Sequence, residues 1–126
     1  MKKTAMEMIG EAKARVQNLN PDQVAREIEA GALIVDVREP EERKQASIAG
    51  SISAPRGMLE FYADSTLPYH KKEFAADRRI ILHCAGGGRS ALAADTLQQM
   101  GYSNVAHLDG GLKAWQDAGK PTTSGE

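Results

Sequence analysis

The chain of 126 residues is long enough for one ordinary domain with a buried core. A hydrophobic content of 41% and a charged content of 26% are typical of a globular protein and exclude a disordered chain. The 16 Lys and Arg residues nearly balance the 17 Asp and Glu residues, so the net charge is -1. This balance argues against nucleic acid as a partner, because nucleic-acid-binding domains usually carry a basic face.

The single cysteine excludes an internal disulfide and a zinc site built from several cysteines, and it favours a reducing compartment. The first three residues, Met-Lys-Lys, resemble the start of a signal peptide, but Glu7 and Glu11 interrupt the apolar stretch that would have to follow. No segment approaches the roughly 20 consecutive apolar residues of a membrane span. We therefore expect a soluble, cytoplasmic protein with no membrane partner.

The N-terminal segment predicts an amphipathic helix over residues 1–15. A capping box spans Thr4 to Glu7, and apolar residues follow it at helical spacing. Residues 16–19 can either extend this helix or form a short strand, since so short a stretch has no decisive period. A second helix begins at Asn20-Pro21, a capping residue followed by a proline suited to the first turn, and it ends at Gly31.

The rest of the chain alternates between apolar runs and helical patterns. Four apolar runs predict strands, at residues 32–37, 51–54, 79–83 and 105–108. Two further helices are predicted, at residues 90–100 and after the glycine pair 110–111. The stretch 57–76 has a weaker signal, and Pro68 prevents one continuous helix there. Residues 122–126 are expected to form a flexible tail.

Strands that alternate with helices imply parallel pairing through right-handed crossovers, with helices on both faces of the sheet. Neither an internal repeat nor a linker divides the chain. The predicted fold is therefore one α/β domain over residues 16–121, preceded by the helical extension and followed by the tail.

The most informative segment joins the predicted strand 79–83 to the helix that follows. It places Cys84 at the carboxyl end of a buried strand, where open α/β sheets bind ligands. The glycines 86–88 allow successive backbone N–H groups to point inward as an anion-binding nest, and the helix start adds more free amides. Such a ring stabilises a thiolate, a persulfide anion or a bound oxyanion, and Arg89 adds a positive charge. We therefore expect a nucleophilic sulfur that meets an anionic partner.

The loop also has other interpretations. A lone cysteine is often an inert, buried hydrophobic residue, and the glycines could simply allow a tight turn. The glycine spacing lacks both the G-x-G-x-x-G pattern of dinucleotide folds and the Gly-Lys-Ser/Thr ending of a P-loop. Cysteine phosphatases place five residues between the cysteine and the arginine, whereas four separate Cys84 from Arg89. The shorter ring favours a target smaller than a phosphate ester.

This loop and three other segments resemble the rhodanese family, and the resemblance runs from about Val16 to Pro121. The four segments are Asp36–Glu42 (DVREPEE), Ile48–Pro55 (IAGSISAP), Cys84–Ser90 (CAGGGRS) and Asp109–Trp115 (DGGLKAW). Two departures stand out. Ser47 occupies a position where the family often has histidine, and the loop from Ala85 to Gly88 carries no charge.

The resemblance implies a three-layer α/β fold with a central, mostly parallel sheet of about five strands, which favours a strand for residues 16–19. It implies a sulfurtransferase in which Cys84 attacks the outer sulfur of a small anionic donor such as thiosulfate and carries that sulfur as a persulfide. The acceptor would be cyanide, a thiol or an acceptor protein. No metal and no organic cofactor is implied. The anion-binding loop would consist of Ala85, Gly86, Gly87, Gly88, Arg89 and Ser90.

Several residues outside the loop are weaker candidates. Asp36 is expected to support the site or cap the segment after it, and Arg38 to hold the scaffold by pairing with a carboxylate. Arg56 could contact substrate or simply be solvated. His83 should point to the sheet face opposite Cys84, because side chains alternate along a strand. A homodimer is possible through the helical extension or the aromatic residues at 61–62.

Two competing functions remain at this point. One is a small phosphatase or arsenate reductase on the same fold, which the short loop disfavours. The other is a non-catalytic binding module, which the retained Cys84 disfavours.

Overall fold

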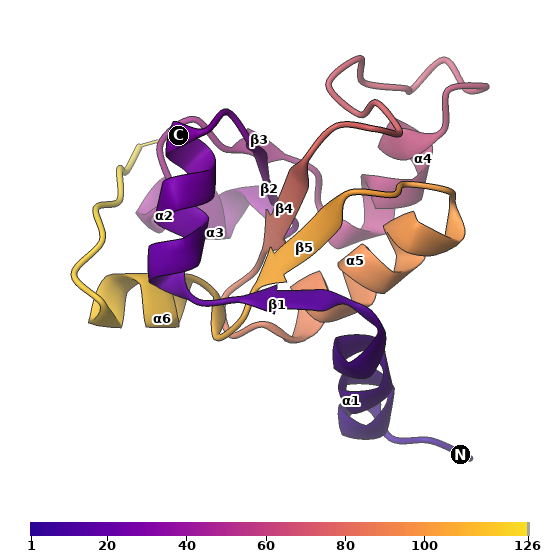
Figure 1. The fold of residues 1–126 in the computed structure, drawn as a ribbon, viewed down its shortest axis with the longest axis horizontal. Helices are drawn as coiled ribbons and strands as arrows, with labels where there is room; N and C mark the ends of the chain where they lie inside the picture. The colour runs from indigo at the N-terminus through magenta and orange to yellow at the C-terminus, as the bar shows by residue number, and fades with distance from the viewer. Residues whose placement is uncertain (126) are drawn as a thin grey trace.

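The structure is a computed structural model and describes residues 1–125 (Figure 1). Its sheet contains five strands: β1 (Gln17–Leu19), β2 (Leu33–Asp36), β3 (Ile52–Ser53), β4 (Ile80–His83) and β5 (Val105–Leu108). The helices are α1 (Ala5–Arg15), α2 (Pro21–Glu29), α3 (Pro40–Gln45), the 3-10 turn η1 (Arg56–Met58), α4 (Leu59–Ala63), α5 (Gly88–Gln99) and α6 (Gly111–Asp117). All strand pairs in this sheet are parallel, in the order β1-β5-β4-β2-β3.

The predicted α/β class is confirmed, and the segment after the first helix is a strand. Helix α3 was not expected from the sequence. It has six residues, too few to reveal a helical period, and it starts from Pro40 with the Glu42 side chain accepting the Glu39 N–H at 2.9 Å. The weakly patterned stretch after β3 contains only η1 and the short helix α4, followed by turns.

The sheet separates two apolar cores, which explains why β2, β4 and β5 are buried at every position. One core packs α4 and α5 on a sheet face that includes Val35, Leu82 and Cys84. The other packs α2 and α6 on the opposite face, around Ile34, Ile81 and other buried residues. In Figure 1, α2, α3 and α6 lie on one side of the sheet and α4 and α5 on the other.

The strand order fixes where a ligand can bind. From β2 the chain moves outward to β3, whereas from β4 it moves outward to β5, so the order reverses between the adjacent strands β2 and β4. The carboxyl ends of strands at such a reversal form the usual binding crevice of open α/β sheets. Asp36 ends β2 and Cys84 directly follows β4, so the candidate residues flank this point.

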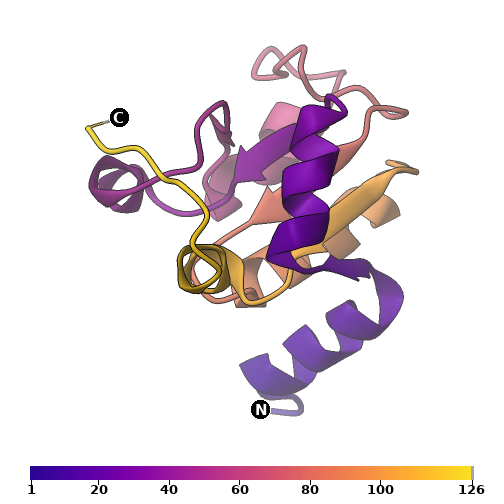
Figure 2. The ribbon, with the colours of Figure 1, turned by 60° about the vertical axis from the view of Figure 1, so that its left-hand side comes forward.

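Helix α1 is docked on α5, beside the sheet (Figures 1 and 2). Its capping box is present: the Thr4 side chain accepts the Glu7 backbone N–H, and the Glu7 side chain accepts the Thr4 backbone N–H. Ala12 is fully buried, and the guanidinium of Arg15 forms two hydrogen bonds, of 2.9 and 2.7 Å, with the Asp95 carboxylate on α5. The helical extension is thus packed against the helix that begins at the cysteine loop.

The predicted tail is hydrogen-bonded in its described part. Ser47 and Thr123 exchange two backbone hydrogen bonds of 2.8 Å, and the Gly125 N–H donates to the Lys44 carbonyl at 3.0 Å. The flexibility of residues 122–126 stays a prediction, and residue 126 lies outside the described residues.

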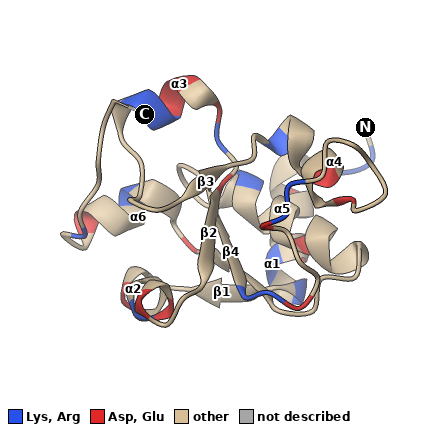
Figure 3. Cartoon of the chain, turned by 90° about the horizontal axis from the view of Figure 1, so that it is seen from above, with Lys and Arg blue, Asp and Glu red and all other residues tan. Residues whose placement is uncertain are grey.

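Charges of both signs are distributed over the surface elements, and α2, α3 and α6 each carry basic and acidic residues (Figure 3). Within residues 1–125, no helix has the length and apolar character needed to cross a membrane. The mixture of signs gives these helices no surface of a single charge.

Docking of α1 can be tested by placing a charge in its contact. Ala12→Asp should lower the free energy of unfolding by more than about 2 kcal/mol, because a buried carboxylate would lack a partner. The matched control is Ala14→Asp, at an exposed position of the same helix, which should cost much less. Urea denaturation followed by circular dichroism measures both. Equal losses would show that α1 is not docked in solution.

Candidate active site

The loop between β4 and α5 surrounds the sulfur of Cys84. The Sγ atom accepts a hydrogen bond from the Gly87 N–H at 3.1 Å and another from the Ser90 N–H at 3.4 Å. Cys84 is only 1% exposed, and the exposed rim of the loop is formed by Ala85 and Gly86. Because α5 begins at Gly88 and runs for 12 residues, its free amides and positive end also face this site. The N–H groups of the loop are thus preorganised to stabilise a negative charge on the sulfur or on an atom bound to it.

The first turn of α6 holds the outer side of this loop. The Leu112 N–H donates to the Cys84 carbonyl at 2.8 Å, and the Lys113 N–H donates to the Ala85 carbonyl at 3.1 Å. Gly111 makes this approach possible, since a Cβ atom built there would lie 2.5 Å from the carbonyl carbon and oxygen of Ala85. Its φ of +63° is a second reason for glycine. Gly111 at the start of α6 therefore allows the helix to contact the cysteine loop directly.

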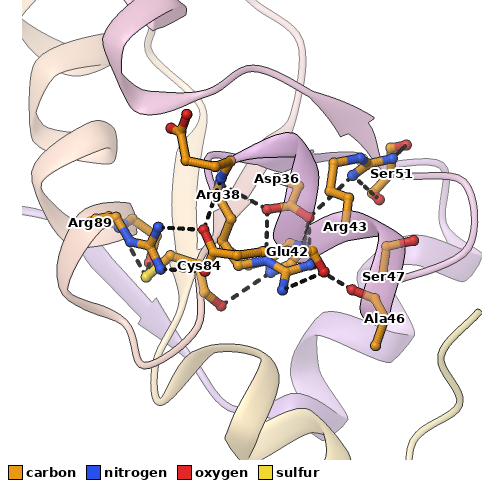
Figure 4. A network of polar contacts seen from close by, with 12 residues as sticks. Asp36, Arg38, Glu42, Arg43, Ala46, Ser47, Ser51, Cys84 and Arg89 are labelled. Atoms are coloured by element: carbon orange, nitrogen blue, oxygen red, sulfur yellow. Dashed lines mark hydrogen bonds and ion pairs between the residues drawn. The ribbon is translucent and has the colours of Figure 1, made fainter. Parts of the chain in front are cut away.

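The side chain of Arg89 is paired with α3. Its guanidinium makes two hydrogen bonds, of 2.9 and 3.0 Å, with the Glu42 carboxylate (Figure 4). These bonds from Arg89 lower the pKa of Glu42 below its usual value, against the opposing effect of burial. Arg89 therefore contributes a positive charge beside the loop that is already partly neutralised. The sequence did not reveal this partner, because α3 itself was not predicted.

A buried charge cluster lies at the end of β2. The Asp36 carboxylate accepts hydrogen bonds from Arg38 Nε at 3.0 Å, from Arg38 Nη2 at 2.9 Å and from Arg43 Nη1 at 3.1 Å (Figure 4). The Arg38 N–H also donates to it, at 2.9 Å. Burial alone would raise the pKa of Asp36, but the hydrogen bonds from Arg38 and the nearby positive charges outweigh it and lower that pKa. The cluster joins β2 to the segment containing α3, which carries Glu42.

His83 points to the sheet face opposite Cys84. It is fully buried, with Nε2 3.6 Å from the nearer Asp36 carboxylate oxygen and Nδ1 3.3 Å from the Cys84 carbonyl oxygen. Burial lowers the pKa of His83 and outweighs the opposing effect of the Asp36 charge. The imidazole is therefore neutral at physiological pH and packs against the carbonyl side of the loop, away from the sulfur.

Arg56 lies away from the cysteine loop. Its guanidinium pairs with Glu60 at 2.9 Å and donates to the Thr96 hydroxyl at 3.1 Å. Thr96 is six residues beyond Ser90 on α5, which corresponds to roughly 9 Å along a helix axis. That Arg56 contacts substrate stays a prediction, and neither of these two side-chain interactions supports it. Within residues 1–125, no group of three or more His, Cys, Asp or Glu side chains could hold a metal ion.

A polar chain on the sulfur side, buried at Ser90 and His107, was not predicted from the sequence. The Ser90 hydroxyl lies 3.5 Å from Cys84 Sγ and 2.9 Å from His107 Nδ1, and His107 Nε2 lies 2.7 Å from Asn18 Oδ1. Burial lowers the pKa of His107 to about 4. The strand pattern places Leu82 and Cys84 on one face, but the pairing of His107 with Leu82 in the sheet is visible only in the structure.

The Asp36 cluster predicts a strong effect of one neutral substitution. Asp36→Asn should lower the free energy of unfolding by about 3–5 kcal/mol, because the buried guanidinium of Arg38 loses its ion pair with the Asp36 carboxylate. Since the pKa of Asp36 is lowered by folding, its contribution is complete above about pH 3.9 and is lost as the pH falls through the folded-state pKa. Denaturation at pH 7 and at acid pH measures this. Asp22→Asn, at an exposed pair with Lys120, is the control and should have little effect.

The contact between α6 and the cysteine loop is tested with two glycines of positive φ. Gly119→Ala should cost about 1 kcal/mol, since its φ is +76° but no atom lies within 4 Å of the added Cβ. Gly111→Ala should cost at least about twice as much, because the same strain is joined by the clash with Ala85. Thermal and urea denaturation compare the two variants. Equal losses of unfolding free energy in the two variants would mean that the cysteine loop moves aside without cost and that its contact with α6 is not tight.

Comparison with known proteins shows the family of this chain. The rhodanese-like domain matches residues 20–118. A sulfurtransferase of Allochromatium vinosum is 33% identical over 94 residues, which make up 75% of this chain and 80% of the relative. The thiosulfate sulfurtransferase GlpE of Pseudomonas aeruginosa is 32% identical over 112 residues, or 87% of this chain and 94% of that protein.

Solved structures agree. A protein of unknown function and possible tyrosine phosphatase from Rhodopseudomonas palustris CGA009 is similar, with a TM-score of 0.91 and 41% identity, over 98% of this chain and 96% of that chain. Because the family match spans most of the chain, the chain belongs to the rhodanese-like domain family.

Proposed function

We propose that the protein is a sulfurtransferase that carries sulfane sulfur as a persulfide on Cys84. The observation that carries this proposal is the position of Cys84 Sγ, which accepts N–H bonds from Gly87 and Ser90 at the start of α5. A sulfurtransferase needs a nucleophilic sulfur beside donors that stabilise negative charge before and after transfer. The names of the relatives in Allochromatium vinosum and Pseudomonas aeruginosa point to the same class of reaction.

In the first half-reaction the Cys84 thiolate attacks the outer sulfur of a small anionic donor such as thiosulfate. The new bond joins the two sulfur atoms, and the bond from the outer sulfur to the sulfonate sulfur breaks, so that sulfite leaves with its electron pair. The product is the Cys84 persulfide anion. Its negative charge lies on the outer sulfur, within reach of the free amides of the loop and of the positive end of α5.

In the second half-reaction a thiophilic acceptor takes the outer sulfur and returns the Cys84 thiolate. Cyanide, a thiol or an acceptor protein has the required nucleophile. The chain contains only one cysteine, so the persulfide cannot be resolved as an internal disulfide and must pass to an external acceptor. Arg89 supplies charge near the loop, and its pairing with Glu42 favours a small donor that is bound mainly by backbone N–H groups.

The alternative function is hydrolysis of phosphate esters, which the description of the Rhodopseudomonas palustris relative suggests for that protein. Four residues between Cys84 and Arg89 make a tight ring, and the guanidinium is already held by both oxygens of Glu42. A phosphate dianion would have to compete for that guanidinium. The paired guanidinium therefore favours sulfur transfer over hydrolysis of phosphate esters.

Intact-mass spectrometry tests the proposal. After incubation with thiosulfate the protein should gain about 32 Da, the mass of one sulfur atom, and cyanide should remove the addition. Cys84→Ser should gain nothing. Hydrolysis of p-nitrophenyl phosphate is measured in parallel and should stay at the level of the Cys84→Ser variant. Phosphate release that depends on Cys84, without a sulfur adduct from thiosulfate or another sulfane donor, would contradict sulfur transfer and support the alternative.

A further inference from the structure

The Ser90 hydroxyl lies between the sulfur of Cys84 and the imidazole of His107. All three residues are buried, with at most 1% of each exposed. The hydroxyl oxygen is 2.9 Å from His107 Nδ1, 3.5 Å from Cys84 Sγ and 3.4 Å from the Gly87 carbonyl oxygen. A hydroxyl has one proton to donate, so these neighbours compete for it.

Asn18 decides which nitrogen of His107 carries a proton. Its Nδ2 group donates to two backbone carbonyls, those of Lys13 at 2.9 Å and Val16 at 3.1 Å. The Oδ1 atom therefore faces His107 Nε2, at 2.7 Å, and this short contact requires that Nε2 carry the hydrogen. In the neutral imidazole Nδ1 is then an acceptor only, and its donor at 2.9 Å is the Ser90 hydroxyl.

The charged groups around this chain leave His107 neutral. Burial lowers the pKa of His107 to about 4, Lys13 acts in the same direction, and Asp109 opposes them. Lys13 and Asp109 pair with each other at 3.1 Å. On the α5 side, Arg89 is paired with Glu42. At physiological pH, therefore, Nδ1 keeps its lone pair and the Ser90 proton stays directed toward it.

The orientation of the Ser90 O–H toward His107 affects the thiol, the thiolate and the persulfide of Cys84 differently. With its proton on His107, the Ser90 oxygen presents lone pairs to Sγ, at 3.5 Å. A thiol can donate its hydrogen to those lone pairs. A thiolate at Sγ gains no donor from Ser90 unless the 2.9 Å bond to His107 breaks. In a persulfide Sγ is uncharged, because the negative charge lies on the outer sulfur, so nothing is lost.

We propose that Asn18 and His107 are positioning residues which hold the Ser90 hydroxyl away from the sulfur and thereby disfavour the Cys84 thiolate relative to the persulfide. The loop amides stabilise a negative charge on either sulfur. Because the Ser90 hydroxyl does not donate to Sγ, the Cys84 thiolate lacks one hydrogen bond, and the equilibrium shifts toward the persulfide. The statement about the persulfide rests on the proposed function, whereas the statement about the thiolate does not.

The thiolate is measured by the rate of iodoacetamide alkylation of Cys84 as a function of pH. His107→Leu removes the acceptor and frees the hydroxyl to donate to the thiolate. The midpoint of the alkylation curve should then fall by about one pH unit, as expected for one hydrogen bond to a charged group. Asn18→Ala should shift the midpoint in the same direction by a smaller amount, because water in place of Asn18 permits either tautomer. Asn18 is exposed, so this variant is expected to keep the fold.

Two controls identify the hydroxyl as the cause. His107→Asn keeps an amide oxygen near the place of Nδ1, so Ser90 retains its acceptor and the midpoint should stay at the wild-type value. In a Ser90→Ala background, His107→Leu should cause no shift. A midpoint that rises in His107→Leu would make His107 the proton acceptor for Cys84 and overturn the proposal. So would a shift that persists without Ser90, or no shift in both His107→Leu and Asn18→Ala.

A second readout concerns the loaded carrier. At a fixed ratio of thiosulfate to sulfite, at a pH above both midpoints, the equilibrium constant for persulfide formation should fall about tenfold in His107→Leu, matching the shift of one pH unit. Mass spectrometry gives the loaded fraction. If the wild-type protein forms no persulfide with any sulfane donor, the proposed function fails, while the alkylation curves still decide the role of His107.

Discussion

Backbone hydrogen bonds from α6 to the carbonyls of Cys84 and Ala85 fix the conformation on which the site depends. A loop can present N–H groups to its inside only if its carbonyl groups find donors outside, since a buried unpaired carbonyl is costly. The first turn of α6 supplies two of these donors, and Gly111 at the start of the helix allows the backbones to approach. Helix α6 is therefore a structural part of the cysteine loop, although α5 and β5 lie between them in the sequence.

The charges near the loop are arranged in pairs. Asp36 neutralises part of the charge of Arg38 and Arg43 inside the protein, and Glu42 holds Arg89 at the rim. What remains for a bound anion is mainly the set of backbone N–H groups, which have a fixed direction and no side-chain entropy to lose. Such a site discriminates by size and charge distribution more than by total charge, which fits a terminal sulfur anion.

Much of the fold could be predicted from the sequence, because the buried strands read as continuous apolar runs and the glycines mark where helices begin and end. The place of Cys84 at the end of β4 followed from the same pattern. Helix α3 was not predicted because six residues are too few to show a helical period. Its residue Glu42, the partner of Arg89, was therefore not predicted either. The link from Ser90 to His107 depends on which strands are neighbours, and β5 pairs with β4 through a crossover that local patterns do not encode. Asn18 was missed for the same reason, since it reaches His107 across 89 positions of sequence.

The two carbonyls that orient Asn18 belong to Lys13 and Val16, at the end of α1 and the start of β1. The family match begins at residue 20, so it excludes Asn18 and both of its anchors. A protein trimmed to the family boundaries would keep the sulfur, its loop and His107, yet it would lose the group that chooses the tautomer of that imidazole. The region that the family model matches and the shortest segment that contains the whole polar chain from Ser90 to Asn18 are thus different lengths of the same chain. Under the role proposed for Asn18, transplanting the loop into a relative without this N-terminal segment would carry over Cys84 but not the residue that orients His107.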